Sequence, residues 1–235
     1  MATQLLNDDG TASMATMMMS SHFAFRRDLA CFASSLTADR VNAEALSAEW
    51  TTYRGSLHGH HSVEDANVFP DLRARHPELA GAIDELDAHH RAIDPLLERG
   101  DRVFADLAAN LGEARDLIGE LQRLLAEHLD AEEAVVIPHL RAAKEFPVPP
   151  SDDVLAMYAD GFAWSCAGIA PSVFSQICAI LPPALVAKLP AARDAFDARC
   201  LRVWGRVHVD ESVTSAPARG YAPRSQRDHR KQGGS

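Results

Sequence analysis

Four long stretches of the chain place apolar residues three or four positions apart, which is the spacing of one face of an α-helix. They span about residues 14–37, about 42–75, from Pro77 to a break at residues 110–112, and about 112–145. No stretch sustains an alternation of apolar and polar residues, so little of the chain can form a sheet. Four long helices with short connections predict an all-α, up-down-up-down four-helix bundle.

The remaining segments divide the chain further. Residues 1–13 are expected to form a flexible leader, and residues 14–146 the bundle. A Pro-Val-Pro-Pro run at the start of residues 147–208 ends the bundle, and a helical extension is predicted to follow it. Residues 209–235 are rich in Ser, Pro, Gly, Arg and Gln, which is typical of a disordered tail.

The predicted extension contains an uncharged run from Gly161 to Ala187, long enough to raise the question of a membrane span. Pro171 and Pro182 interrupt the run, and no basic cluster flanks it, so a membrane span is not favoured. We expect helices that pack on the bundle, or a homo-oligomer contact through residues 151–208. Pro95, inside the third predicted helix, should distort that helix locally.

Composition narrows the function classes. The chain has 235 residues, 47% of them apolar and 24% charged, as in an ordinary globular protein. Its net charge of -10 argues against a nucleic-acid partner. Its four cysteines form no C-x-x-C pair, which argues against a disulfide framework or a thiolate zinc site. With no basic, signal-like N-terminus, these features predict a cytoplasmic protein.

Ionisable residues interrupt the apolar stripes of all four predicted helices. The pattern H-x-x-x-E occurs twice, as His60/Glu64 and His128/Glu132, and its two members lie on one helix face. Burying such groups is costly unless they are paired or bind metal. The candidate metal ligands on the stripes are His22, His60, Glu64, His90, His128 and Glu132.

The depth of these six residues in the bundle supports a shared site. Measured from the predicted turns at ~1.5 Å per residue, all six fall within a slab roughly 7 Å thick. Imidazoles combined with carboxylates suit a pair of iron or manganese ions, whereas a single zinc needs only four ligands. The zinc-protease pattern H-E-x-x-H is absent.

These motifs resemble the hemerythrin-like, or HHE, domains over about residues 18–146. The repeated signature reads HHSVEDANVFP at 60–70 and HLDAEEAVVIP at 128–138, and HFAFRRDL and AHHRAI carry the isolated histidines of the other two helices. The resemblance implies two non-haem iron ions, bridged by carboxylate and oxo groups, that react with dioxygen, peroxide or nitric oxide. It also implies that Glu64 and Glu132 bridge the irons and that the four histidines are terminal ligands.

The sequence departs from oxygen-carrying hemerythrins, which place two histidines four apart on the third helix. Here Leu86 stands four residues before His90, so the set is one histidine short, and His61 is the obvious substitute. An open metal position suits redox turnover, so catalase-like decomposition of hydrogen peroxide is the favoured hypothesis. The alternatives are an oxygen, nitric oxide or iron sensor or store, and a bundle whose polar core binds nothing.

Several side chains allow two interpretations. His89 and His90 both fit the stripe, and the resemblance selects His90. Asp65 and Glu133 either orient ligand imidazoles or belong to a solvated face. The two aromatic residues of the second helix, Trp50 and Tyr53, are interpreted as core, with a redox relay as the alternative.

Overall fold

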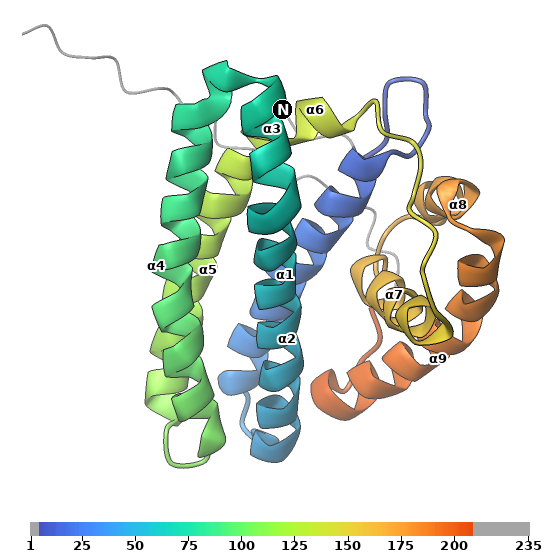
Figure 1. The fold of residues 1–235 in the computed structure, drawn as a ribbon. Helices are drawn as coiled ribbons and strands as arrows, with labels where there is room; N and C mark the ends of the chain where they lie inside the picture. Colours follow the sequence, from blue (N-terminus) through green and yellow to red (C-terminus); the bar gives the residue numbers. More distant parts are fainter. Residues whose placement is uncertain (1–4, 209–235) are drawn as a thin grey trace, which may run out of the picture.

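The structure is a computed structural model that describes residues 5–208, and these residues form helices and connecting turns without a strand (Figure 1). The predicted all-α class is therefore confirmed. The helical elements, in chain order, are α1 (Met14–Leu36), α2 (Ala43–Val63), the π-helical η1 (Glu64–Val68), α3 (Phe69–Arg75), the 3-10 helix η2 (Pro77–Leu79), α4 (Ala80–Ala105), α5 (Leu111–Val135), α6 (Ile137–Leu140), α7 (Asp152–Ser165), α8 (Pro171–Ile180) and α9 (Pro183–Trp204).

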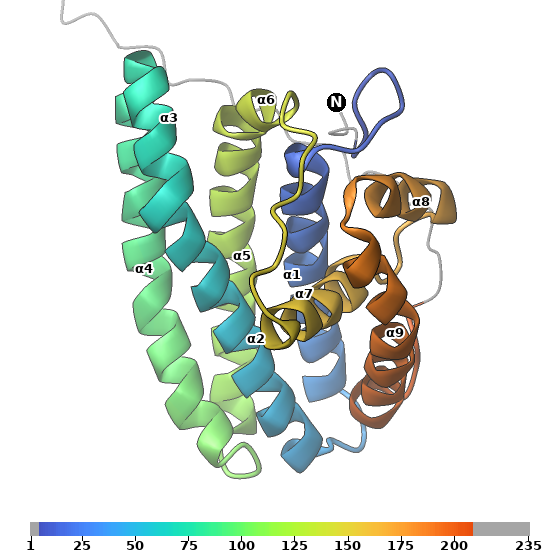
Figure 2. The ribbon, with the colours of Figure 1, turned by 45° about the vertical axis from the view of Figure 1, so that its right-hand side comes forward.

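Helix α1, the α2–α3 run, α4 and α5 form the predicted up-down-up-down bundle (Figures 1 and 2). Short connections, residues 37–42 and 106–110, join the antiparallel neighbours at one end. Local signals set the helix starts. Ser13 and Thr16 form a capping box at α1, and the Asn42 side chain accepts a hydrogen bond from the backbone of Ala45 at α2.

The second predicted helix, over 42–75, is not regular throughout. At η1 the backbone N–H of Phe69 donates to the carbonyl oxygen of Glu64, five residues back. Pro70 has no N–H to donate to the preceding turn, which disfavours the regular α-helical hydrogen-bond pattern there. Helical structure therefore covers the predicted span, but it contains an irregular turn that begins at a candidate ligand.

The fourth predicted helix, over 112–145, is shorter than expected. It breaks at Val136, between α5 and α6, and helical structure ends at Leu140. Pro138 is the physical reason, since it removes a backbone donor just after the break. In contrast, α4 continues as one α-helix through Pro95, where a distortion was expected.

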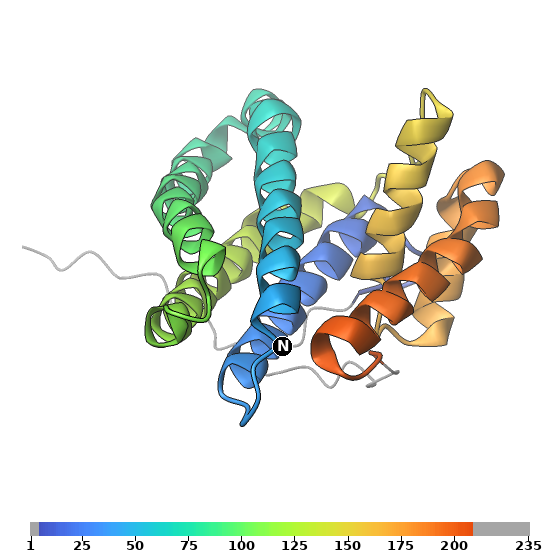
Figure 3. The ribbon, with the colours of Figure 1, turned by 90° about the horizontal axis from the view of Figure 1, so that it is seen from below.

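Helices α7 to α9 form an extension along one side of the bundle, seen from below in Figure 3. Helix α7 packs on α1 and on α9, and α9 also contacts α2. The indole N–H of Trp164 donates to the buried carboxylate of Asp28 at 2.7 Å, and Arg27 donates to the carbonyl oxygens of Trp164 and Ala167. Among residues 5–208, no helix is long and apolar enough to cross a membrane.

Residues 5–13, expected to be part of a flexible leader, lie against the end of the bundle. The Asn7 side chain donates to the carbonyl oxygen of Arg141 at 3.1 Å, and the Met14 N–H donates to that of Ala143 at 2.7 Å. Ala12 and Ser13 are buried. Residues 1–4 and the predicted tail, 209–235, lie outside the described part of the chain.

The bundle core has two apolar parts with a polar layer between them. The larger part includes Leu57, Ile93 and Leu125, and the smaller part includes Phe69 and Leu86. Along each helix, the candidate ligands have a residue of the larger apolar part on one side and a residue that packs in the smaller apolar part on the other. The polar layer is therefore closed off from water along the bundle axis.

Candidate metal centre

Seven ionisable side chains meet in this polar layer, and they come from all four sides of the bundle. Helices α1 and α4 each supply one histidine, α2 with η1 supplies two histidines and a glutamate, and α5 supplies a histidine and a glutamate. Six of them are buried, and the seventh, His60, is partly buried. The seven are His22, His60, His61, Glu64, His90, His128 and Glu132.

The ligand atoms fall into two groups, and within each group they lie within 4.8 Å of one another. The first group contains His22, His60, Glu64 and Glu132. The second contains His61, Glu64, His90 and His128. Each group is small enough to surround one metal ion, and Glu64 belongs to both.

Each glutamate contacts histidines of both groups. The two oxygens of Glu64 lie 2.8 Å from His60 Nε2 and 3.5 Å from His90 Nε2. Oε2 of Glu132 lies 3.3 Å from His22 Nε2 and 3.5 Å from His128 Nε2. Both carboxylates therefore stand where a pair of ions would share them.

Most of these atoms have no hydrogen bond, although they are buried. Within residues 5–208, Nε2 of all five histidines and both oxygens of Glu64 and Glu132 lack a hydrogen-bond partner. Each buried polar atom left in this state costs about 1–3 kcal/mol. Nitrogen and oxygen lone pairs that face one another are satisfied by a cation between them, so the side chains fit a metal site.

Burial keeps most of these imidazoles neutral. It lowers the pKa of His60 to about 4 and that of His128 to about 3, and it also lowers the pKa of His61, beside His90 and His128. A neutral imidazole has a free lone pair, which is the form that binds metal. At neutral pH these three side chains are therefore in the form that metal binding requires.

The other charges form one compact network. Burial alone would lower the pKa of His22, but its close contacts with Glu132 and Glu133 outweigh burial and raise that pKa to about 9. Burial disfavours the charged form of Glu132 as well, yet the contact with His22 lowers its pKa overall. Burial, together with the charge of Glu132, raises the pKa of Glu64. Metal uptake must therefore displace protons from this network.

His61, which the sequence suggested as the substitute for a missing histidine, lies in the second group. Its ring stacks on His90, with centroids 4.0 Å apart, and lies 5.1 Å from the ring of His128. Leu86 instead belongs to the smaller apolar part of the core. Adjacent residues of one helix, His60 and His61, thus face different groups of the same layer.

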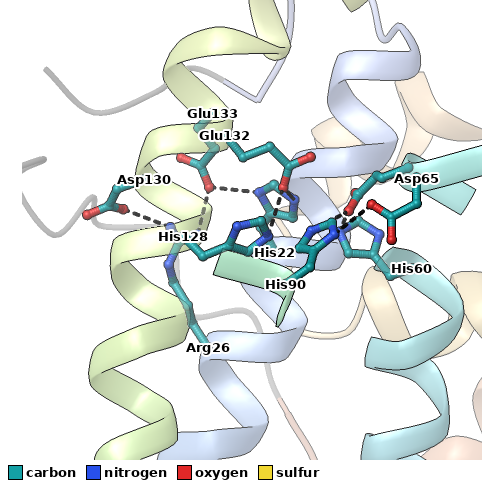
Figure 4. Close-up of polar contacts among 10 residues, drawn as sticks. His22, Arg26, His60, Asp65, His90, His128, Asp130, Glu132 and Glu133 are labelled. Atoms are coloured by element: carbon teal, nitrogen blue, oxygen red, sulfur yellow. Dashed lines mark hydrogen bonds and ion pairs between the residues drawn. The ribbon is translucent and has the colours of Figure 1, made fainter. Parts of the chain in front are cut away.

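The isolated histidines have contacts on their outer sides as well (Figure 4). Nδ1 of His22 lies 3.1 Å from Glu133, and Nδ1 of His90 lies 2.9 Å from Asp65. Arg26 binds Glu133 at 2.7 Å, a contact that sequence reasoning missed. The available signal was a basic residue one helical turn after His22.

The remaining candidates lie outside the two groups. His90 is buried and belongs to the second group, whereas His89 is in neither group. Trp50 and Tyr53 are buried in the larger part of the apolar core. The Trp50 N–H donates to Asp101 at 3.0 Å, whereas the Tyr53 hydroxyl has no partner within the described residues.

Comparison with known proteins agrees with this arrangement. The family model of the hemerythrin HHE cation-binding domain matches residues 13–140, a span that holds all seven side chains. No curated protein and no solved structure matches the chain significantly. The matched span is more than half of the sequence and contains the whole bundle, and the described helices continue beyond it. The chain therefore belongs to the hemerythrin HHE cation-binding domain family.

Proposed function

We propose that this protein is a non-haem di-iron protein that binds dioxygen reversibly. The observation that carries the proposal is the convergence of five imidazoles and two carboxylates whose Nε2 and carboxylate oxygen atoms are buried and lack hydrogen-bond partners within residues 5–208. The family is a cation-binding one, and this mixed donor set suits iron. A bundle that binds nothing would leave these atoms unsatisfied, which argues against that alternative.

The donors are divided unequally. The second group has three imidazoles and the first has two, and both carboxylates contact histidines of each group. If both carboxylates were shared, an ion in the first group would have fewer protein donors than an ion in the second, which would leave more room for an outside ligand. When bound, a ferrous pair supplies the electrons that dioxygen or peroxide accepts.

The chain's own side chains set the surroundings of that ligand. Three of the histidines are neutral at neutral pH, so they add no charge to the layer. Leu57 and Ile93 on one side, and Phe69 and Leu86 on the other, keep bulk water from the layer. Such surroundings favour a small uncharged ligand over an anion.

Decomposition of hydrogen peroxide is the second candidate. It was favoured from the sequence because the ligand set was one histidine short. With His61 in the second group, that shortage disappears, and the argument for turnover is weaker. The candidate is retained because the first group, with two imidazoles, leaves space at which peroxide can enter.

A cytoplasmic location is proposed as well, supported by four free cysteines.

The contact between α7 and α1, the helix that carries His22, also allows a sensing role in which the extension responds to the site.

One experiment separates these versions. Iron-loaded, reduced protein is exposed to dioxygen under a visible spectrometer, purged with argon, and then given hydrogen peroxide in an oxygen electrode. Reversible binding predicts a spectral change that argon reverses, with little oxygen released from peroxide. Sustained release of oxygen from peroxide would contradict reversible binding and support decomposition of hydrogen peroxide.

Two variants control the experiment. His128→Gln removes a donor of the second group, and His139→Gln removes a histidine outside both groups. We expect the first variant to abolish the spectral change and the second to retain it. Equal behaviour of the two variants would contradict the proposed site.

A further inference from the structure

Each signature carries a second acid directly after its inward glutamate: Asp65 follows Glu64, and Glu133 follows Glu132. Neither second acid belongs to the two groups of ligand atoms. One step along an α-helix turns a side chain by about 100°, so the second acid points towards a neighbouring helix instead of the centre of the layer. The structure shows what it contacts there.

Both second acids reach the isolated histidine of another helix (Figure 4). Glu133 extends from α5 to His22 on α1, and Asp65 extends from η1 to His90 on α4. The carboxylate oxygens can only accept, so the ring Nδ1–H of each histidine donates to them. The same pattern therefore occurs twice, once for each group of ligand atoms.

These contacts decide which face of each ring turns inward. Nδ1 is engaged outside the layer, and Nε2 is left 3.3 Å from Glu132 in His22 and 3.5 Å from Glu64 in His90. A neutral imidazole has one N–H and one lone pair. When the ring is neutral, as metal binding requires, a proton held at Nδ1 therefore leaves the lone pair on Nε2, inside the layer.

We propose that Glu133 and Asp65 are positioning residues that orient His22 and His90 and present their Nε2 lone pairs to the metal pair. The purpose assigned to them rests on the proposed function, but the contacts themselves do not. In this view the two consecutive acids of each signature have different roles. The first faces the layer, and the second holds a histidine of another helix.

The two positioning contacts differ in strength. The Glu133 side chain is 15% exposed and is also bound by Arg26, which is bound in turn by Asp130 at 2.8 Å. The Asp65 side chain is 51% exposed. Water can replace a half-exposed acceptor, whereas a buried hydrogen bond in low dielectric has no such substitute. Loss of Glu133 should therefore matter more than loss of Asp65.

The first test measures iron(II) affinity without oxygen, by competition with a coloured chelator. We expect Glu133→Leu to weaken one of two bound irons by about 10–100-fold, and Asp65→Leu to have a smaller effect. Glu127→Leu is the matched control, because Glu127 is an exposed acid of α5 that pairs with Arg123. Wild-type affinity in a folded Glu133→Leu protein would overturn the proposal.

The second test needs no metal. In metal-free protein with nitrogen-15-labelled histidine, each positioned ring should give a downfield, slowly exchanging Nδ1–H proton. Glu133→Gln should remove or shift one such signal and Asp65→Asn the other, while the control changes neither. If the wild-type protein shows no such signals, the positioning contacts do not exist in solution. If these signals are present but the protein binds no iron, the proposed function is refuted, whereas the orientation of the two rings by Glu133 and Asp65 is supported.

Discussion

The stability of the metal-free protein should be greatest near neutral pH, because its buried imidazoles do not take up protons that the unfolded chain binds. The pKa of His60 falls from 6.5 to about 4 on folding, and that of His128 to about 3. A group with a lowered folded pKa favours folding above its unfolded pKa, and the benefit is lost as the pH falls. Stability should therefore fall below pH 6.5.

The magnitude follows from the number of protons involved. Below pH 6.5, His60, His128 and His61 each bind a proton only after unfolding, because burial lowers all three pKa values. Glu64 acts in the opposite direction, because burial raises its pKa. The net uptake of about two protons lowers stability by about 4 kcal/mol between pH 6.5 and 5. That is a large part of the roughly 5–15 kcal/mol typical of a folded domain.

The trend reverses on the alkaline side. The contacts of His22 with Glu132 and Glu133 outweigh burial and raise the pKa of His22 to about 9. The stability that this raised pKa contributes is complete below pH 6.5 and is lost as the pH rises to 9.

Urea denaturation from pH 5 to 9, with a chelator present, measures the whole profile. His128→Gln should reduce the acidic slope by about 1.4 kcal/mol per pH unit, the contribution of one proton. Bound metal should flatten the slope, because coordinated imidazoles are unavailable to protons. A flat profile between pH 6.5 and 5 in the metal-free protein would refute the argument.

Three further predictions concern single side chains. His61→Gln should weaken iron at the second group, while His58→Gln, an exposed neighbour on the same helix, should leave both irons in place, as chelator competition can measure. Gly100→Ala should cost about 1–3 kcal/mol in urea denaturation, because an added Cβ overlaps the Trp50 ring. Asp28→Asn should cost about 3–5 kcal/mol and loosen the extension, because it removes the buried carboxylate that binds the α7 indole N–H, and limited proteolysis can detect this. Unchanged proteolysis would contradict the last expectation.

The fold and the polar layer could be predicted because both follow from helical periodicity. A buried face repeats every three or four residues, and His60, Glu64, His128 and Glu132 stand on that repeat. Depth along antiparallel helices follows from counting residues from the turns. The common depth of the six side chains could therefore be predicted from the sequence.

Other features depend on local backbone chemistry or on long-range contacts. The π-helical turn at Glu64 arises where Pro70 removes a backbone donor, and periodicity does not reveal such a turn. His61 lies off the regular stripe, so periodicity did not select it; it was suggested as the substitute for a missing histidine, and it lies in the second group. The contact of Arg26 with Glu133 joins α1 to α5 across more than a hundred residues of sequence. No local sequence pattern predicts a contact between residues so far apart in the chain.

The central claim is that two iron ions lie between Glu64 and Glu132, one within each group of histidines. Anomalous X-ray diffraction from iron-loaded crystals, measured at the iron edge, tests it most directly. We predict two peaks, one beside His22 and His60 and the other beside His61, His90 and His128. A single peak, peaks elsewhere, or no peak in crystals grown with iron would contradict the account.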